Sequence, residues 1–195
     1  EHAKQIEANE LALANAISVA KLGEPVEKMG AIIEKTLKDK GFNPVYNLGG
    51  HGVSKNNIHD WPSVPNHAGG TSDKLKEGIA VAIEPFASTG VGEVRDDVIV
   101  EIFSLVEKKG VRSPVAKQIL NLLDKYEGRP FAERWIRKEL DGKVSDFGLT
   151  LGLKELMKNK SIHTYPGLKE AKGTIVTQIE KTIIINDGET IVLGE

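Results

Sequence analysis

The chain has 195 residues, a length that suits one medium domain or two small ones and is ample for a hydrophobic core. With 39% hydrophobic and 28% charged residues it has the composition of a soluble globular protein, and a net charge of −2 gives no global reason to expect a nucleic-acid or membrane partner. It has no cysteine, which excludes disulfides, thiolate catalysis and cysteine-based zinc sites, so any metal must bind through His, Asp, Glu or backbone oxygen.

The first 41 residues predict two helices. The first covers about residues 4–21 and stops at Gly23-Glu24-Pro25; the second is opened by Pro25 and ends at Gly41. Their apolar stripes are Ile6, Leu11 or Leu13, Ile17 and Ala20 in the first helix, and Val26, Met29, Ile32, Ile33 and Leu37 in the second. The chain opens inside a helical pattern without an initiator methionine and without a signal peptide, and no apolar run approaches the ~20 residues that span a bilayer. We therefore expect a cytoplasmic fragment.

The segment from 47 to 70 is glycine-rich and holds three of the five histidines, which makes it either a flexible surface loop or the floor of a metal site. A short strand is predicted over 45–53, running into this loop. Further strands are predicted over 78–86, GIAVAIEPF, and over 98–106.

From about Val111 onward the pattern predicts three helices followed by strands, as in a winged helix. Ser113 and Pro114 are typical of an N-cap and a first helical position; a second helix is predicted from about Pro130, and a third over 146–157. Asn186-Asp187-Gly188 predicts a hairpin turn. Residues 111–173 carry 13 Lys or Arg and 8 Asp or Glu, a net +5, which would suit a DNA-binding winged helix. Because charges of both signs are interspersed, we favour a solvated accessory subdomain.

Two glutamates lie in strand-like apolar runs, Glu84 in GIAVAIEPF and Glu180 in TIVTQIEKTIII. Alternation places Glu84 on a face lined by glycine and alanine, which leaves space beside it. Both carboxylates are expected to be at least partly buried, and a buried carboxylate needs a cation, hydrogen bonds or a proton. Each glutamate alone fits a salt bridge. Together with a histidine-rich loop they favour a divalent metal site about as strongly as a structural role.

The histidines are weaker signals one by one. His51 lies between glycines that allow close backbone approach, and His59 follows eight residues later, a spacing that gives no i, i+4 helical ligand pair. His67 lies in PNHAGG, which is expected to be a solvated loop, and His2 and His163 have no carboxylate-rich context. Taken singly, each is better explained as a surface or hydrogen-bonded residue.

Four separated motifs, NLGGHGVSKNNIHDWPSVPN, LKEGIAVAIEPFASTGVGEV, RPFAERWIRKEL and GTIVTQIEKTIII, resemble in order and spacing the type II methionine aminopeptidases of archaea and eukaryotes. The resemblance covers essentially the whole chain. It implies the α/β (α+β) pita-bread fold with a winged-helix-like insertion, and removal of the N-terminal methionine from nascent polypeptides by a dinuclear metal-activated water. It divides the chain into catalytic residues 1–106, an insertion over 107–172 and C-terminal catalytic strands over 173–195.

The resemblance also implies residue roles. His51, Glu84 and Glu180 fall on metal ligands, Glu84 doubles as the proton shuttle, and His59 falls on the histidine that contacts the reacting carbonyl. His163 or Tyr165 is expected near the pocket for the methionine side chain. Two divalent ions are implied, of which Co, Mn, Fe, Ni and Zn all suit N/O ligands. Nascent polypeptide, and through it the ribosome, would be the partner; no membrane and no nucleic acid is expected.

Departures from the family pattern lead to a second expectation. The two aspartate ligands and a further histidine would precede Glu1, Lys181 stands where the family usually has histidine, and Asp60-Trp61 replaces a pair of small residues. We therefore expect the site to be incomplete and the isolated chain to have little or no peptidase activity. The alternative is a non-catalytic homologue that binds protein or RNA on the same fold, against which the match of His51, Glu84 and Glu180 weighs.

Overall fold

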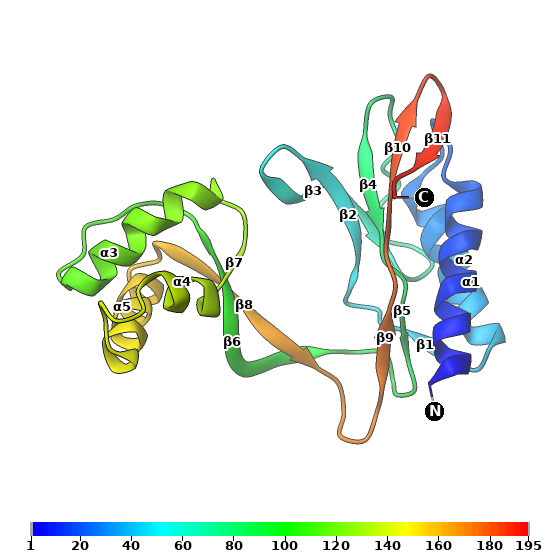
Figure 1. Cartoon of the computed structure of the whole chain (residues 1–195). Helices are drawn as coiled ribbons and strands as arrows, with labels where there is room; N and C mark the ends of the chain where they lie inside the picture. The colour runs from blue at the N-terminus through cyan, green and yellow to red at the C-terminus, as the bar shows by residue number, and fades with distance from the viewer. Residues whose placement is uncertain (1, 195) are drawn as a thin grey trace. The chain divides into compact units, whose positions relative to one another are not determined.

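The computed structural model describes residues 2–194, and the chain divides into two compact units. Unit 1 comprises Glu1–Arg95 and Lys169–Glu195, and unit 2 comprises Asp96–Leu168 (Figure 1). No helix among the described residues has the length and apolar character that crossing a membrane would require. The assignment of these segments to a catalytic domain and an insertion stays a prediction.

Unit 1 is built on two antiparallel sheets. The five-stranded sheet has the order β11-β10-β4-β2-β3, and the three-stranded sheet has the order β1-β5-β9. The bounds are β1 Asn43–Pro44, β2 Gly49–Ser54, β3 Asn57–Pro65, β4 Ala80–Ile83, β5 Phe86–Ser88, β9 Val176–Gln178, β10 Lys181–Asn186 and β11 Glu189–Val192.

Helices α1 (Ala3–Val19) and α2 (Val26–Asp39) pack against each other and close the core of unit 1 (Figure 1). The predicted face of α2 is confirmed at Val26, Met29, Ile33 and Leu37, all at most 1% exposed. The predicted stripe of α1 is wrong in part, because Ile6 and Leu11 are 46% and 40% exposed. The buried face is formed by Ala8, Ala12, Leu13, Ala16 and Ala20 together with the amides Gln5 and Asn9.

Hydrogen bonding explains the two buried amides of α1. Gln5 Nε2 donates to the carbonyl oxygens of Ala87 and Ile175 at 2.8 and 3.0 Å, and Asn9 Nδ2 donates to Thr177 Oγ1 at 2.9 Å. Burial of an amide costs little free energy when protein acceptors replace its hydrogen bonds to water in this way. A hydrophobicity pattern scores such positions as surface, and the helix face was misassigned for that reason.

The segment from Asn47 to Gly70 is largely a hairpin of β2 and β3, so the prediction of a loop is wrong over these strands. The predicted strand over 45–53 is confirmed only from Gly49 onward, since Val45 lies between β1 and β2. Glycine permits this pairing. A Cβ on Gly50 would lie 2.1 Å from the carbonyl oxygen of Ala82, and one on Gly52 would lie 1.9 Å from that of Trp61. The glycines therefore serve close strand approach and not flexibility.

Unit 2 contains β6 (Arg95–Leu105), α3 (Pro114–Leu123), η1 (Asp124–Tyr126), β7 (Phe131–Ala132), α4 (Glu133–Glu139), α5 (Asp146–Lys158) and β8 (Ile162–Lys169). Its sheet has the order β7-β6-β8, and its separate core gathers Phe103, Ile119, Leu123, Ile136 and Leu156. The helix predicted from Pro130 begins only at Glu133, because Phe131 and Ala132 pair with Phe103 and Ile102 of β6. These two residues fit the helical pattern of the sequence, but in the structure they form strand β7, so the helix starts later than predicted.

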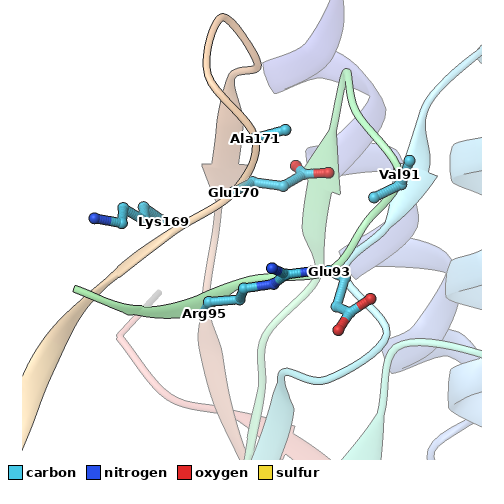
Figure 2. Close-up of a pocket in the computed structure, with 6 residues that line it drawn as sticks. All are labelled: Val91, Glu93, Arg95, Lys169, Glu170 and Ala171. Carbon is cyan, nitrogen blue, oxygen red and sulfur yellow. The ribbon is translucent and has the colours of Figure 1, made fainter.

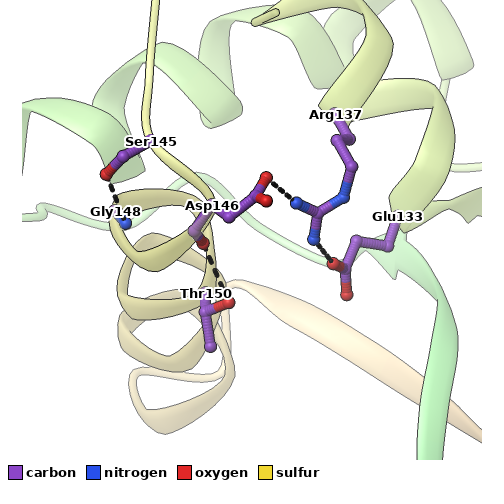
Figure 3. A network of polar contacts seen from close by, with 6 residues as sticks. All are labelled: Glu133, Arg137, Ser145, Asp146, Gly148 and Thr150. Atoms are coloured by element: carbon purple, nitrogen blue, oxygen red, sulfur yellow. Dashed lines mark hydrogen bonds and ion pairs between the residues drawn. The ribbon is translucent and has the colours of Figure 1, made fainter.

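Polar contacts fix the helix starts of unit 2. Ser113 Oγ accepts from Ala116 N at 3.3 Å, which confirms the predicted N-cap, and Ser145 Oγ accepts from Gly148 N at 3.1 Å. Figure 3 shows the Arg137 guanidinium between Glu133 of its own helix and Asp146 at the start of α5. A carboxylate at this helix end also suits the helix dipole.

Candidate metal centre

His51 and Glu84 form the contact around which the candidate site is built. His51 Nε2 lies 3.0 Å from Glu84 Oε1, with side chains 19% and 13% exposed. The other ring nitrogen, Nδ1, lies 3.0 Å from the carbonyl oxygen of Gly52. A carbonyl oxygen only accepts, so Nδ1 donates and Nε2 is directed at the carboxylate. The contact between Nε2 and Glu84 Oε1 then requires a proton on one of these two atoms. A backbone carbonyl that accepts from one ring nitrogen and so orients the other is common for ligating histidines.

Glu84 lies in a negative and poorly solvated environment. Burial raises the pKa of its carboxyl group, and the negative charge of Glu180 raises it further, whereas His51 and Gln178 act in the opposite direction. Gln178 Nε2 donates to Glu84 Oε2 at 3.3 Å. A carboxylate held in this way gains from a bound proton or a cation.

The strand register explains why two glutamates so distant in sequence come together. Ile83 pairs with Lys181 in the five-stranded sheet, and Phe86 pairs with Gln178 in the three-stranded sheet. Glu84 therefore lies in the connection from β4 to β5, and Glu180 lies in the connection from β9 to β10. At these two neighbouring connections the chain passes between the five-stranded and the three-stranded sheet.

Glu180 does not have the environment predicted for it. It lies between β9 and β10, outside either strand, and it is exposed where partial burial was predicted. The alternation of a continuous strand does not extend across a change of sheet, which is why the prediction failed.

His59 lies on β3, and its ring centroid is 4.5 Å from that of His51. It is exposed, as a residue that contacts an incoming ligand must be. The structure thus brings His51, His59 and Glu84 together, with Glu180 close enough to act on Glu84 by its charge. Among residues 2–194, no three His, Cys, Asp or Glu side chains form a cluster arranged to hold a metal. The ligand roles stay predictions.

His163 and Tyr165 lie on β8, in unit 2, whereas His51, Glu84 and Glu180 lie in unit 1. Their rings contact each other edge to face at 4.7 Å, and the Tyr165 hydroxyl lies 3.3 Å from Ser104 Oγ. Their predicted place beside a methionine pocket stays a prediction.

One side chain that contacts the candidate centre lacked an assignment from sequence, namely Gln178. It shares a predicted strand face with Glu180, which was the available signal, but its hydrogen bond to Glu84 depends on the pairing of β5 with β9.

A separate cavity of about 320 Å³ in unit 1 contains none of the predicted site residues; Val91, Glu93, Arg95, Lys169, Glu170 and Ala171 line it (Figure 2). Glu170 is bound within the fold, accepting from Ser88 Oγ and from Gly92 N.

The donor set of the candidate centre fits a divalent transition metal by its chemistry. It offers an imidazole nitrogen and carboxylate oxygens, the ligands that such ions take in the absence of thiolates. The anchored Nδ1 of His51 and the raised pKa of Glu84 both fit a site that a cation would complete.

The chain is similar in sequence to archaeal methionine aminopeptidases. It is 39% identical to a methionine aminopeptidase of Thermococcus onnurineus over 89% of this chain and 58% of that protein, and 38% identical to one of Pyrococcus abyssi over 97% and 64%. The chain thus spans about 58% to 64% of the length of these relatives.

Solved structures give the fold. A thermophilic Arx1 superposes with a TM-score of 0.80 at 15% identity, over 98% of this chain and 57% of that one. Methionine aminopeptidase from Thermotoga maritima superposes with a TM-score of 0.54 at 21% identity, over 96% and 49%. These likenesses confirm the predicted mixed α/β pita-bread fold. The model of metallopeptidase family M24 matches residues 1–113, and the chain belongs to this family.

Proposed function

We propose that this chain carries the C-terminal part of a metalloaminopeptidase site that removes the N-terminal methionine of nascent proteins. The observation that supports it most is the His51–Glu84 contact, which joins an oriented imidazole nitrogen to a carboxylate of raised pKa in a member of a metallopeptidase family. Archaeal relatives named methionine aminopeptidase supply the substrate class.

His51, Glu84 and Glu180 would hold the divalent ions, two in the full site. When bound, these ions polarise the scissile carbonyl and lower the pKa of a water molecule. Glu84 would take the proton from the attacking water and deliver it to the leaving amine, a task for which a raised carboxyl pKa is suited. His59 would donate a hydrogen bond to the carbonyl oxygen as negative charge develops there.

Metal binding tests this proposal without requiring turnover. Isothermal titration with Mn²⁺ and with Co²⁺, checked by elemental analysis, is expected to show binding to the native chain and its loss in His51→Ala. His67→Ala is the matched control, since the Nδ1 of this histidine also donates to a backbone carbonyl oxygen, that of Ala68 at 2.8 Å, away from the site. No binding to the native chain, or equal binding by His51→Ala, would overturn the proposal.

A non-catalytic role in binding protein or RNA is the second candidate. It is favoured by one observation, the lack of a three-donor cluster among residues 2–194. Failure of metal binding in the titration above would favour it. For residues 107–172 we propose a winged-helix-like insertion, and for the whole protein an association with nascent chains at the ribosome.

A further inference from the structure

The hairpin of β2 and β3 has an irregular register directly beside His51. His51 pairs with Ser63, but the next residue of β2, Gly52, pairs with Asp60. Trp61 and Pro62 are therefore extra residues that face a single step of β2. A bulge of this kind turns side chains away from the regular ladder and is frequent beside functional sites.

The backbone of Trp61 is held firmly in this bulge. Its carbonyl oxygen fills the space where a side chain on Gly52 would lie, and its N–H donates to Asp60 Oδ1 at 2.7 Å. The indole ring, in contrast, is 42% exposed. A large aromatic surface is thus presented to solvent from a bulge whose backbone lies against Gly52, the residue that follows the candidate ligand His51.

Lys76 covers part of this ring. Its Nζ lies 4.3 Å from the centroid of the Trp61 ring, close enough for a cation–π contact. The preceding residue, Leu75, is 1% exposed and its N–H bonds the carbonyl oxygen of Glu24 at 3.0 Å, so the lysine projects from an anchored segment. No carboxylate among the described residues forms an ion pair with Lys76. An aromatic face and an uncompensated ammonium group therefore lie together.

A substrate cut after its first residue extends in one direction only, toward its carboxyl end. With the first residue at His51 and Glu84, surfaces at the rim of the site can meet only the residues that follow. We propose that Trp61 and Lys76 form a subsite for these residues, in which the indole packs against the peptide and the Lys76 ammonium pairs with an acidic side chain. This inference rests on the proposed function and adds a preference for acidic residues near the new N-terminus.

Fluorescence can test the subsite directly, because the chain has two tryptophans, Trp61 and Trp135. In a Trp135→Phe background, Trp61 is the only emitter. The probes are the peptide amides Met-Ala-Glu-NH₂ and Met-Ala-Gln-NH₂, which differ by one charge. We expect both to change Trp61 emission and the glutamate peptide to bind about three- to fivefold more tightly, as for a partly exposed ion pair.

Lys76→Gln is expected to abolish the difference between the two peptides, and 1 M salt is expected to reduce it in the native background. Lys74→Gln removes the same charge two residues away and is the matched control. This variant should keep the difference in affinity between the two peptides. Trp61→Ala, followed by calorimetry, should weaken both peptides. Equal binding of both peptides to the native background, an unchanged preference in Lys76→Gln, or no peptide binding at all would overturn the subsite.

The outcome separates the subsite from the metal centre. Metal binding that depends on His51, without a charge preference that depends on Lys76, would remove the subsite and leave the proposed function. A charge preference without metal binding would remove the proposed catalysis and leave a surface at Trp61 and Lys76 that binds acidic peptides.

Discussion

Gly50→Ala tests how the site is built, because it adds one methyl group where three strands converge. The new Cβ would lie 2.1 Å from the carbonyl oxygen of Ala82 and 3.2 Å from the backbone nitrogen of Glu84. Real Cβ contacts are almost never under 3.0 Å, so β2 and β4 must separate locally by about 0.9 Å. The obstructing atoms are backbone in the middle of a sheet and cannot rotate away. Overpacking costs about 1–3 kcal/mol in ordinary cores, and we expect about 3 kcal/mol here.

The measurement is thermal and urea unfolding, followed by Trp61 emission in the Trp135→Phe background so that unit 1 alone is observed. For a chain of this size, about 3 kcal/mol corresponds to a decrease in Tm of roughly 6–12 °C. The separation also moves Glu84 from His51, so Mn²⁺ affinity should fall at temperatures where the variant is still folded. Gly110→Ala is the control, since a Cβ there meets no atom within 4 Å and its unfolding should be unchanged.

The reasoning would be refuted by a Gly50→Ala variant that unfolds within about 0.5 kcal/mol of the parent, the range usual for neutral surface changes. Such a result would mean that β2 does not approach β4 as closely as described. A variant of lower stability but unchanged Mn²⁺ affinity would keep the packing argument and refute the coupling to the metal centre.

Three further substitutions test other parts of the fold. Ile183→Ala removes a fully buried side chain from the core of unit 1 and should cost about 2–5 kcal/mol in urea unfolding, whereas a loss under 1 kcal/mol would contradict the core assignment. Ser145→Ala removes the N-cap of α5 and should cost about 1 kcal/mol, with restoration by Ser145→Asp as the check. The hydrogen bond from Lys38, and a second from the Ala68 N–H, lower the pKa of Glu34 below its usual value. A depressed carboxyl pKa stabilises the folded state fully above the unfolded pKa of about 4.3. This contribution should decline below that pH and be lost as pH falls through the lower pKa of the folded state. Glu34→Gln should therefore be less stable at pH 7 and approach the parent in acid; an unchanged difference at pH 3 would count against the pair.

Much of the local structure could be predicted because its causes are local. Serine at 113 followed by proline predicts a helix start, and the α2 stripe has the period of a helix with one buried face. The Asn-Asp-Gly turn is confirmed, with positive φ of 53° at Asp187 and 78° at Gly188, angles that few residue types adopt easily. Identification of the family likewise depended on motifs whose order and spacing are visible in the chain itself.

Local sequence signals are therefore sufficient for the helices, most strands, the family resemblance and the residue types of the candidate centre. Tertiary structure decided how these residues meet. The charge of Glu180 acts on Glu84 because two strand pairs change sheets at the same step. The glycines whose pattern predicts a loop are required because the backbones of neighbouring strands pass within contact distance. The environment of a side chain depends on neighbours distant along the chain, whereas capping, turns and periodicity depend on residues a few positions away.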